Sequence, residues 1–74
     1  MKIEQYSVVE LARDLNPKIV KGMRGAVLEK LDDNNFLVEF LNDEGINIEF
    51  AGDFTFMLTT DMIKHVHDQS KSFE

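Results

Sequence analysis

Apolar and polar residues alternate along much of the chain, in short runs that turn-forming residues separate. The alternation is cleanest in residues 46–50, and residues 36–41 place Phe36, Val38 and Phe40 on one face. A period of two sends successive side chains to opposite faces of a strand, so both runs predict half-buried β-strands. Further strands are expected at residues 6–13, 25–31, 54–59 and 63–67.

The run at residues 6–13 has two interpretations. Its second half contains good helix formers, so a helix competes with the strand there. The β-branched pair Val8-Val9 and the breaker Asn16-Pro17 favour the strand, because β-branched side chains suit a pleated surface and proline interrupts a helix. We therefore expect a strand at the start of the domain.

Asp, Asn and Gly mark the boundaries between the runs. Aspartate and asparagine bond their own backbone and tolerate left-handed conformations, which suits tight turns. Residues 60–62 predict a single helical turn, which Thr60 or Asp61 is able to cap. Turns are expected at residues 32–35, 42–45 and 51–53.

The sequence predicts a hairpin over residues 36–50 and indicates which residues of its two strands face each other. A three-residue loop with Gly45 in a left-handed bulge pairs Phe40 with Ile48 and keeps the large apolar side chains on one face. The same register pairs Val38 with Phe50 and sets Glu39 opposite Glu49 on the outer face, with Lys30 near enough to neutralise them.

One core is expected for the whole domain. Residues 14–22 form a loop with Leu15 and either Ile19 or Val20 beneath it. Several short strands between turns indicate a sandwich or barrel, and a chain of 74 residues favours a small barrel. The fold class is therefore all-β, a small barrel of five to six short antiparallel strands over residues 1–67, followed by a flexible tail at 68–74. The residues expected in the core are Val9, Leu11, Val27, Val38, Phe40, Ile48 and Phe56.

A family resemblance follows from the order of these motifs. The segment Gly22-Met23-Arg24-Gly25-Ala26-Val27 resembles the glycine-bracketed turn of SH3-like and KOW-type barrels. The chain resembles more closely a bacterial family known as domain of unknown function 4926, over about residues 7–66, through the segments 8–11, 25–29, 36–40 and 42–45. The resemblance implies an SH3-like barrel and carries no established activity. After Gly45 the chain departs from the family pattern, because residues 46–53 are longer and Thr59-Thr60-Asp61 replaces a proline.

Composition narrows the range of partners. Fourteen acidic and eight basic residues give a formal charge of −6, so the overall field repels phosphate backbones and attracts cationic partners. The same charge also serves solubility alone. The N-terminus lacks the pattern of a signal peptide, no apolar run is long enough to span a membrane, and cysteine is absent, so a cytoplasmic protein is expected.

We expect none of the candidate catalytic or metal-binding residues in the sequence to form a functional site. Gly22 and Gly25 lack the lysine and the following helix of a phosphate loop. His65 and His67 share one face of a strand, a spacing that is common by chance and is expected to bind no metal. The serines lie at a strand start or in the tail, so no nucleophile is indicated. We expect a non-enzymatic protein without a cofactor.

A protein-binding face is the most concrete functional expectation. Exposed apolar side chains within a charged rim are typical of interaction surfaces, although the same leucines could equally lie in the core. We expect a protein-interaction module, such as an acidic inhibitor of the immunity-protein or antitoxin type with a basic protein partner. The alternative is a KOW-like nucleic-acid or ribosome-associated accessory domain that uses Arg13, Lys18, Lys21 and Arg24. The candidate face comprises Glu29, Leu37, Glu39, Leu41, Asn47 and Glu49.

Overall fold

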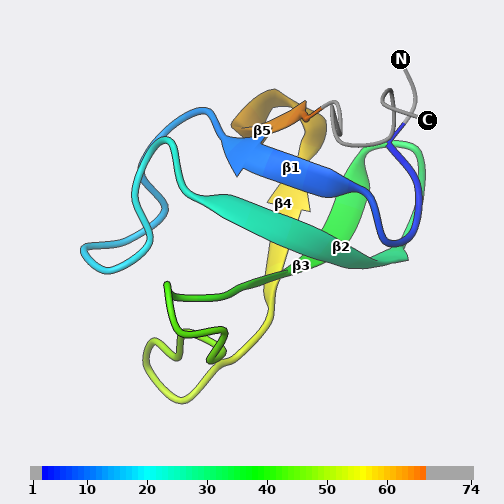
Figure 1. Cartoon of the computed structure of the whole chain (residues 1–74). Coiled ribbons are helices and arrows are strands. Elements are labelled where there is room, and N and C mark those ends of the chain that lie inside the picture. The colour runs from blue at the N-terminus through cyan, green and yellow to red at the C-terminus, as the bar shows by residue number, and fades with distance from the viewer. Residues whose placement is uncertain (1–2, 67–74) are drawn as a thin grey trace, which may run out of the picture.

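The computed structural model describes residues 3–66, which form one antiparallel β-sheet (Figure 1). The spatial order of the strands is β4-β3-β2-β1-β5, so the first strand lies between the second and the last. The elements are β1 (Val8–Leu11), β2 (Arg24–Lys30), β3 (Asn35–Phe40), β4 (Phe56–Thr59), the 3-10 helix η1 (Thr60–Met62) and β5 (Ile63–His65). The expected first strand is confirmed, and the competing helix is wrong.

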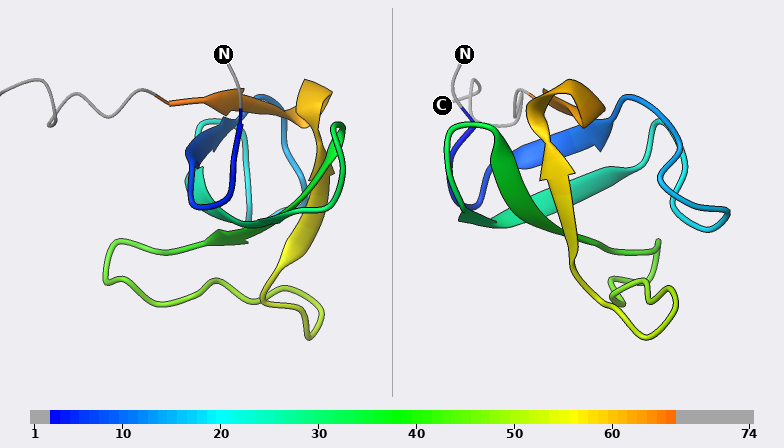
Figure 2. Two further views of the ribbon diagram at one scale, coloured as in Figure 1. Left: turned by 90° about the vertical axis from the view of Figure 1, so that its right-hand side faces the viewer. Right: turned by 180° about the vertical axis from the view of Figure 1, so that it is seen from behind.

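The connection between the two edge strands requires the sheet to curl. β4 and β5 lie at opposite edges, and only η1 joins them. In a flat sheet β4 and β5 would be four strand spacings apart, which is about 19 Å. The chain from Thr59 to Ile63 spans at most about 14 Å, so it could not connect them. A register shift between Val27 and Glu29 adds a β-bulge in β2, and bulges bend and twist strands. The result is the curled half-barrel of Figure 2, and the expected all-β SH3-like fold is confirmed.

The inner face of the curled sheet carries the core. Five of the seven expected core residues are fully buried, and Ile48 and Phe56 pack against them half-buried. The loop between β1 and β2 adds Ile19, which is fully buried, whereas Val20 is exposed. The amide groups of Lys18 and Ile19 both donate to Oδ1 of Asn16 at 2.9 Å, which turns the loop back over the core. The buried set is Val9, Leu11, Ile19, Val27, Phe36, Val38, Phe40, Leu58 and Ile63.

The expected strand at residues 46–50 is wrong. The chain begins to pair as expected, since Leu41 bridges Asn47 and the amide of Ile48 donates to the carbonyl of Phe40 at 2.8 Å. Beyond that point Val38 pairs with Phe56 of β4 instead of Phe50. Only one segment can occupy this edge of β3, and β4 is the segment that continues directly into η1 and β5.

Residues 42–55 therefore form a long loop in place of a hairpin (Figure 1). Gly45 has the expected left-handed backbone, with a φ of 80°. Ala51 and Gly52 are also left-handed, and the backbones of Phe50 and Asp53 bond each other at 3.0 Å in both directions across this turn.

The last third of the domain corrects two smaller expectations. β4 begins at Phe56, and Phe54 is exposed instead of facing inward. The single helical turn η1 is confirmed, but its N-cap is Thr59, and no side chain caps its amides. The hydroxyl of Thr59 instead donates to the Asp61 carboxylate. β5 is described to His65, so His67 and the expected tail at 68–74 lie outside the described residues.

Candidate functional site

Four of the six expected interface residues lie together on the outer face of β2 and β3. Glu29 pairs with Leu37, and Glu39 pairs with Ala26. Their neighbours Phe36, Val38 and Phe40 point inward and are buried, so the alternation of the strand turns Leu37 and Glu39 outward. Leu41 follows at the end of β3 and is 44% exposed. The alternation thus creates a surface of two leucines beside two carboxylates.

The remaining two expected residues have different positions. Asn47 bridges Leu41 and extends the outer face by one position. Glu49 lies in the long loop, where its carboxylate accepts a hydrogen bond from the amide of Gly52 at 2.9 Å. The expected opposition of Glu39 and Glu49 is therefore wrong, because it required a strand that does not form. Glu49 fixes a turn instead of facing Glu39.

Two exposed apolar residues enlarge this face, and the sequence prediction missed them. Met57 of β4 pairs with Leu37 and is 64% exposed. Val8 of β1 pairs with Ala26 and is 41% exposed. Both occupy outward positions of short strands, so the alternation would have identified them once the strand boundaries were known. A shallow apolar hollow of about 200 Å³ lies between Val8, Arg24, Gly25, Ala26 and Leu41.

Charges on the outer face are divided into a paired and an unpaired group. Glu10 lies between Arg24 and Lys64, with N–O distances of 3.8 and 3.9 Å. Lys30, expected beside Glu39, instead pairs with Asp33 at 3.8 Å. Within the described part of the chain, Glu29 and Glu39 therefore have no cationic partner. The β2–β3 side of the face is acidic, whereas on the β1–β5 side the single carboxylate of Glu10 is shared by two cations.

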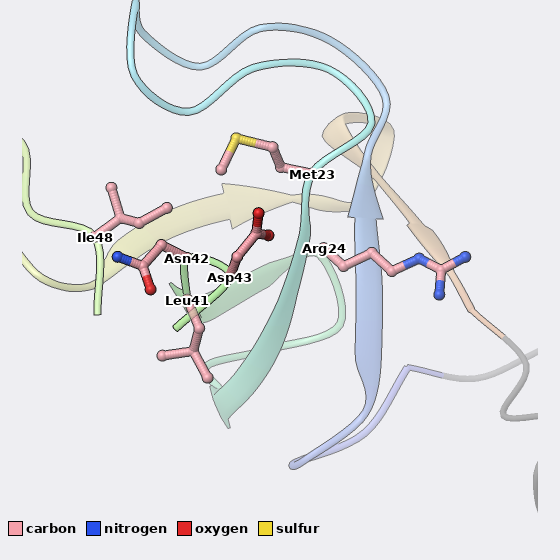
Figure 3. A pocket seen from close by; sticks show the side chains of 6 residues that line it. All are labelled: Met23, Arg24, Leu41, Asn42, Asp43 and Ile48. Atoms are coloured by element: carbon pink, nitrogen blue, oxygen red, sulfur yellow. The ribbon is translucent and has the colours of Figure 1, made fainter. Parts of the chain in front are cut away.

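A second hollow adjoins Leu41, where the β1–β2 loop approaches the long β3–β4 loop. It has a volume of about 380 Å³ and is lined by Met23, Arg24, Leu41, Asn42, Asp43 and Ile48. Figure 3 shows the carboxylate of Asp43 and the side chain of Met23 reaching toward the hollow, while the guanidinium of Arg24 points away toward β1. The sequence pattern places Asp43 at a hairpin tip, as a turn residue and as part of a possible acidic surface, but does not predict the hollow. No local signal reveals this hollow, since it depends on two distant loops.

The four basic residues near the first loop do not form one open patch. Arg13 pairs with Asp61 at 3.5 Å, and Arg24 pairs with Glu10. The ammonium group of Lys18 donates to the backbone carbonyl of Glu49 at 2.5 Å. These contacts direct three of the cations to partners within the domain. The remaining one, Lys21, is an exposed loop residue.

Neither a metal-ligand cluster nor a shifted pKa marks a chemical site among residues 3–66. No cluster of three histidine, aspartate or glutamate side chains is placed to hold a metal in this part of the chain. The pKa of Asp32 is lowered by hydrogen bonds from the Asn34 backbone and the Asn35 side chain. The pKa of Asp61 is lowered chiefly by the Thr59 hydroxyl. Both shifts arise from local turns, so they are structural in origin.

Comparisons with known proteins show a family and add no activity. A family model described as "Domain of unknown function (DUF4926)" matches residues 5–52. This range includes β1, β2, β3 and both sides of the larger hollow, and it ends near the point where the chain departs from the family pattern. No curated protein and no solved structure matches the chain. Within the described residues, no helix is long and apolar enough to cross a membrane.

Proposed function

Because the chain belongs to the DUF4926 family, whose description names no activity, we propose a function from its surface: a non-enzymatic module that binds a basic protein. One observation carries this proposal. The outer face of β2 and β3 exposes Leu41 and part of Leu37 beside Glu29 and Glu39, two carboxylates without an ion pair in the described residues. Apolar centres with polar rims characterise protein interfaces.

The charge of the chain supports a basic partner over a neutral one. The formal charge of −6 produces a field that speeds the approach of a cationic protein. Docking on the β2–β3 side brings cationic side chains to Glu29 and Glu39, while Leu41 and Met57 supply apolar contact. Electrostatics thus guides association and apolar contact slows dissociation.

An acidic inhibitor of a toxin or nuclease, of the immunity-protein or antitoxin type, is the concrete form of this proposal. Such an inhibitor acts by covering a basic active surface, so it requires a rigid acidic face and no catalytic group of its own. The absence of cysteine suits a reducing compartment, and we place the protein in the bacterial cytoplasm.

A KOW-like nucleic-acid or ribosome-associated role is the alternative. It depends on the basic residues of the first loop, and Lys21 is the one without an ion pair or side-chain hydrogen bond among the described residues. Among the described residues, the outward side chains of β2 and β3 include no aromatic ring for base stacking. These contacts support the alternative less than the protein-binding role.

Affinity purification of the tagged chain from the cells that encode it, followed by titration calorimetry with the purified partner, tests the proposal. The key variant is Glu39→Lys, and its control is Asp33→Lys, which changes the net charge equally at the β2–β3 turn. We expect a basic protein partner that binds wild type and Asp33→Lys alike and binds Glu39→Lys at least about fivefold more weakly, roughly 1 kcal/mol.

A second pair of variants tests the apolar part of the face. Leu41→Ser should weaken the same complex, whereas Ile46→Ser, at a loop residue of similar exposure, should not. Circular dichroism confirms that each variant is folded. Binding that is unaffected by both Glu39→Lys and Leu41→Ser would overturn the proposed face. Salt-dependent retention on RNA with no protein partner would support the alternative instead.

A further inference from the structure

The larger hollow has a mixed lining that suits a long cationic side chain. Met23, Leu41 and Ile48 provide apolar walls, and Asp43 provides a carboxylate at one side. Lysine and arginine bury their methylene stems against apolar surface while the charged head keeps a polar partner. A volume of about 380 Å³ is ample for one such side chain.

The lining of the hollow carries one carboxylate whose charge no cation of the described residues balances. Asp43 forms no ion pair within residues 3–66, and its neighbour in the turn, Glu44, forms none either. Arg24 is the one cationic residue in the lining, and its guanidinium points away toward Glu10, with which it pairs (Figure 3). The hollow therefore presents a carboxylate without an internal cation to balance it.

The loop residues around Asp43 are held in place before any ligand binds. Oδ1 of Asn42 accepts hydrogen bonds from the amides of Glu44 at 2.8 Å and Ile46 at 3.0 Å, which fixes the turn that carries Asp43. On the opposite side, Lys18 of the first loop donates to the carbonyl of Glu49 and ties the two loops together. A preformed site loses less conformational entropy on binding than a mobile one.

We propose that this hollow binds a lysine or arginine side chain of the basic partner, with the stem against Met23 and Ile48 and the head at Asp43. The inference rests on the proposed function, since it identifies the anchor residue of the same complex. Leu41 joins the hollow to the outer β2–β3 face, so one partner covers both.

Amide chemical-shift titration of the whole chain with small probes tests this directly. The probes are N-acetyl-lysine methylamide, N-acetyl-arginine methylamide and the neutral N-acetyl-norleucine methylamide. We expect the cationic probes to shift the amides of Met23, Asp43 and Ile48 selectively. Asp43→Asn keeps the shape of the side chain and should weaken their binding about fivefold, the change that corresponds to roughly 1 kcal/mol. Asp53→Asn, in the same loop but outside the hollow, is the matched control and should have no effect.

Each other outcome overturns the inference in a recognisable way. Equal shifts with the norleucine probe would show an apolar hollow without cation preference. Shifts spread over all carboxylates, or insensitive to Asp43→Asn, would show general ion screening. The proposed function is judged separately with the purified partner. A complex that is weakened by Glu39→Lys but not by Asp43→Asn retains the protein-binding role and refutes the anchor. Cationic-probe binding at the hollow with no protein partner would refute the protein-binding role and with it the anchor, leaving only a hollow that prefers cationic side chains.

Discussion

Gly25 and Phe40 are cross-strand partners that approach so closely that position 25 has no room for a side chain. A β-carbon there would lie 2.9 Å from the Phe40 ring and 2.5 Å from the carbonyl oxygen of Glu39. The contact on one side is backbone, so it cannot be relieved by a rotamer change. Only glycine therefore fits at this position of β2.

Gly25→Ala is expected to destabilise the domain by about 3 kcal/mol, because overpacking of a buried site forces the two strands apart. Urea denaturation measures the loss. Gly22→Ala is the control: it has open space around it and a φ of 95°, so only left-handed strain applies, at about 1 kcal/mol. Equal losses at both positions would contradict the steric interpretation.

Phe40→Ala should cost about 3–5 kcal/mol, because it removes a fully buried ring that also contacts Phe56 at a centroid distance of 6.2 Å. Phe54→Ala makes the same chemical change at a ring that is 53% exposed and should cost far less. Thermal melts of both variants make the comparison. A melting temperature for Phe40→Ala close to that of wild type would refute the assigned inner face.

Ala51 is a non-glycine residue with a φ of 55°, so its backbone is strained in the tight turn of the long loop. Ala51→Gly should stabilise the domain by about 0.5–1 kcal/mol, the left-handed penalty less the added freedom of the unfolded chain. Ala51→Val should destabilise it, because branching at the β-carbon worsens the strain. Chemical denaturation should rank the variants Gly, Ala, Val, and any other order would exclude this conformation.

Asp32 should contribute to the loss of stability in acid. Its pKa is lowered in the folded state below the ordinary value of 3.8 by the Asn34 amide and the Asn35 side chain. A lowered folded pKa gives stability that is present above the ordinary value and lost as pH falls through the folded one. Melting temperatures measured from about pH 5 to pH 2 should therefore fall less steeply for Asp32→Asn than for wild type.

Local alternation predicts β3 well because this strand is buried on one face only. Phe36, Val38 and Phe40 lie inward as expected, and Leu37 and Glu39 lie outward, so this part of the candidate face is recoverable from sequence. Gly45 is also predictable, since a left-handed turn position favours glycine.

The competition for the free edge of β3 is not visible in a local pattern. Residues 46–50 and 54–59 both alternate, and either could pair with Val38. Phe56 is its partner because β4 must lead into η1 and reach the far side of β1 within a few residues. The sequence places Glu49 on the face only if residues 46–50 pair with β3, and that pairing does not form beyond Ile48. The hollow at Asp43 was missed because tertiary contacts between two loops create it.

The pairing of β1 with β5 has a consequence for the order of folding. Leu11 pairs with Ile63 from the other end of the domain, whereas β2 and β3 are joined by a short turn. Closing a long loop costs chain entropy before its contacts form, so local hairpins precede distant pairings. The β2–β3 hairpin, which carries most of the candidate binding face, is thus the natural nucleus. The β1–β5 seam is expected to form after this nucleus, so a substitution in the seam should change the unfolding rate more than the folding rate.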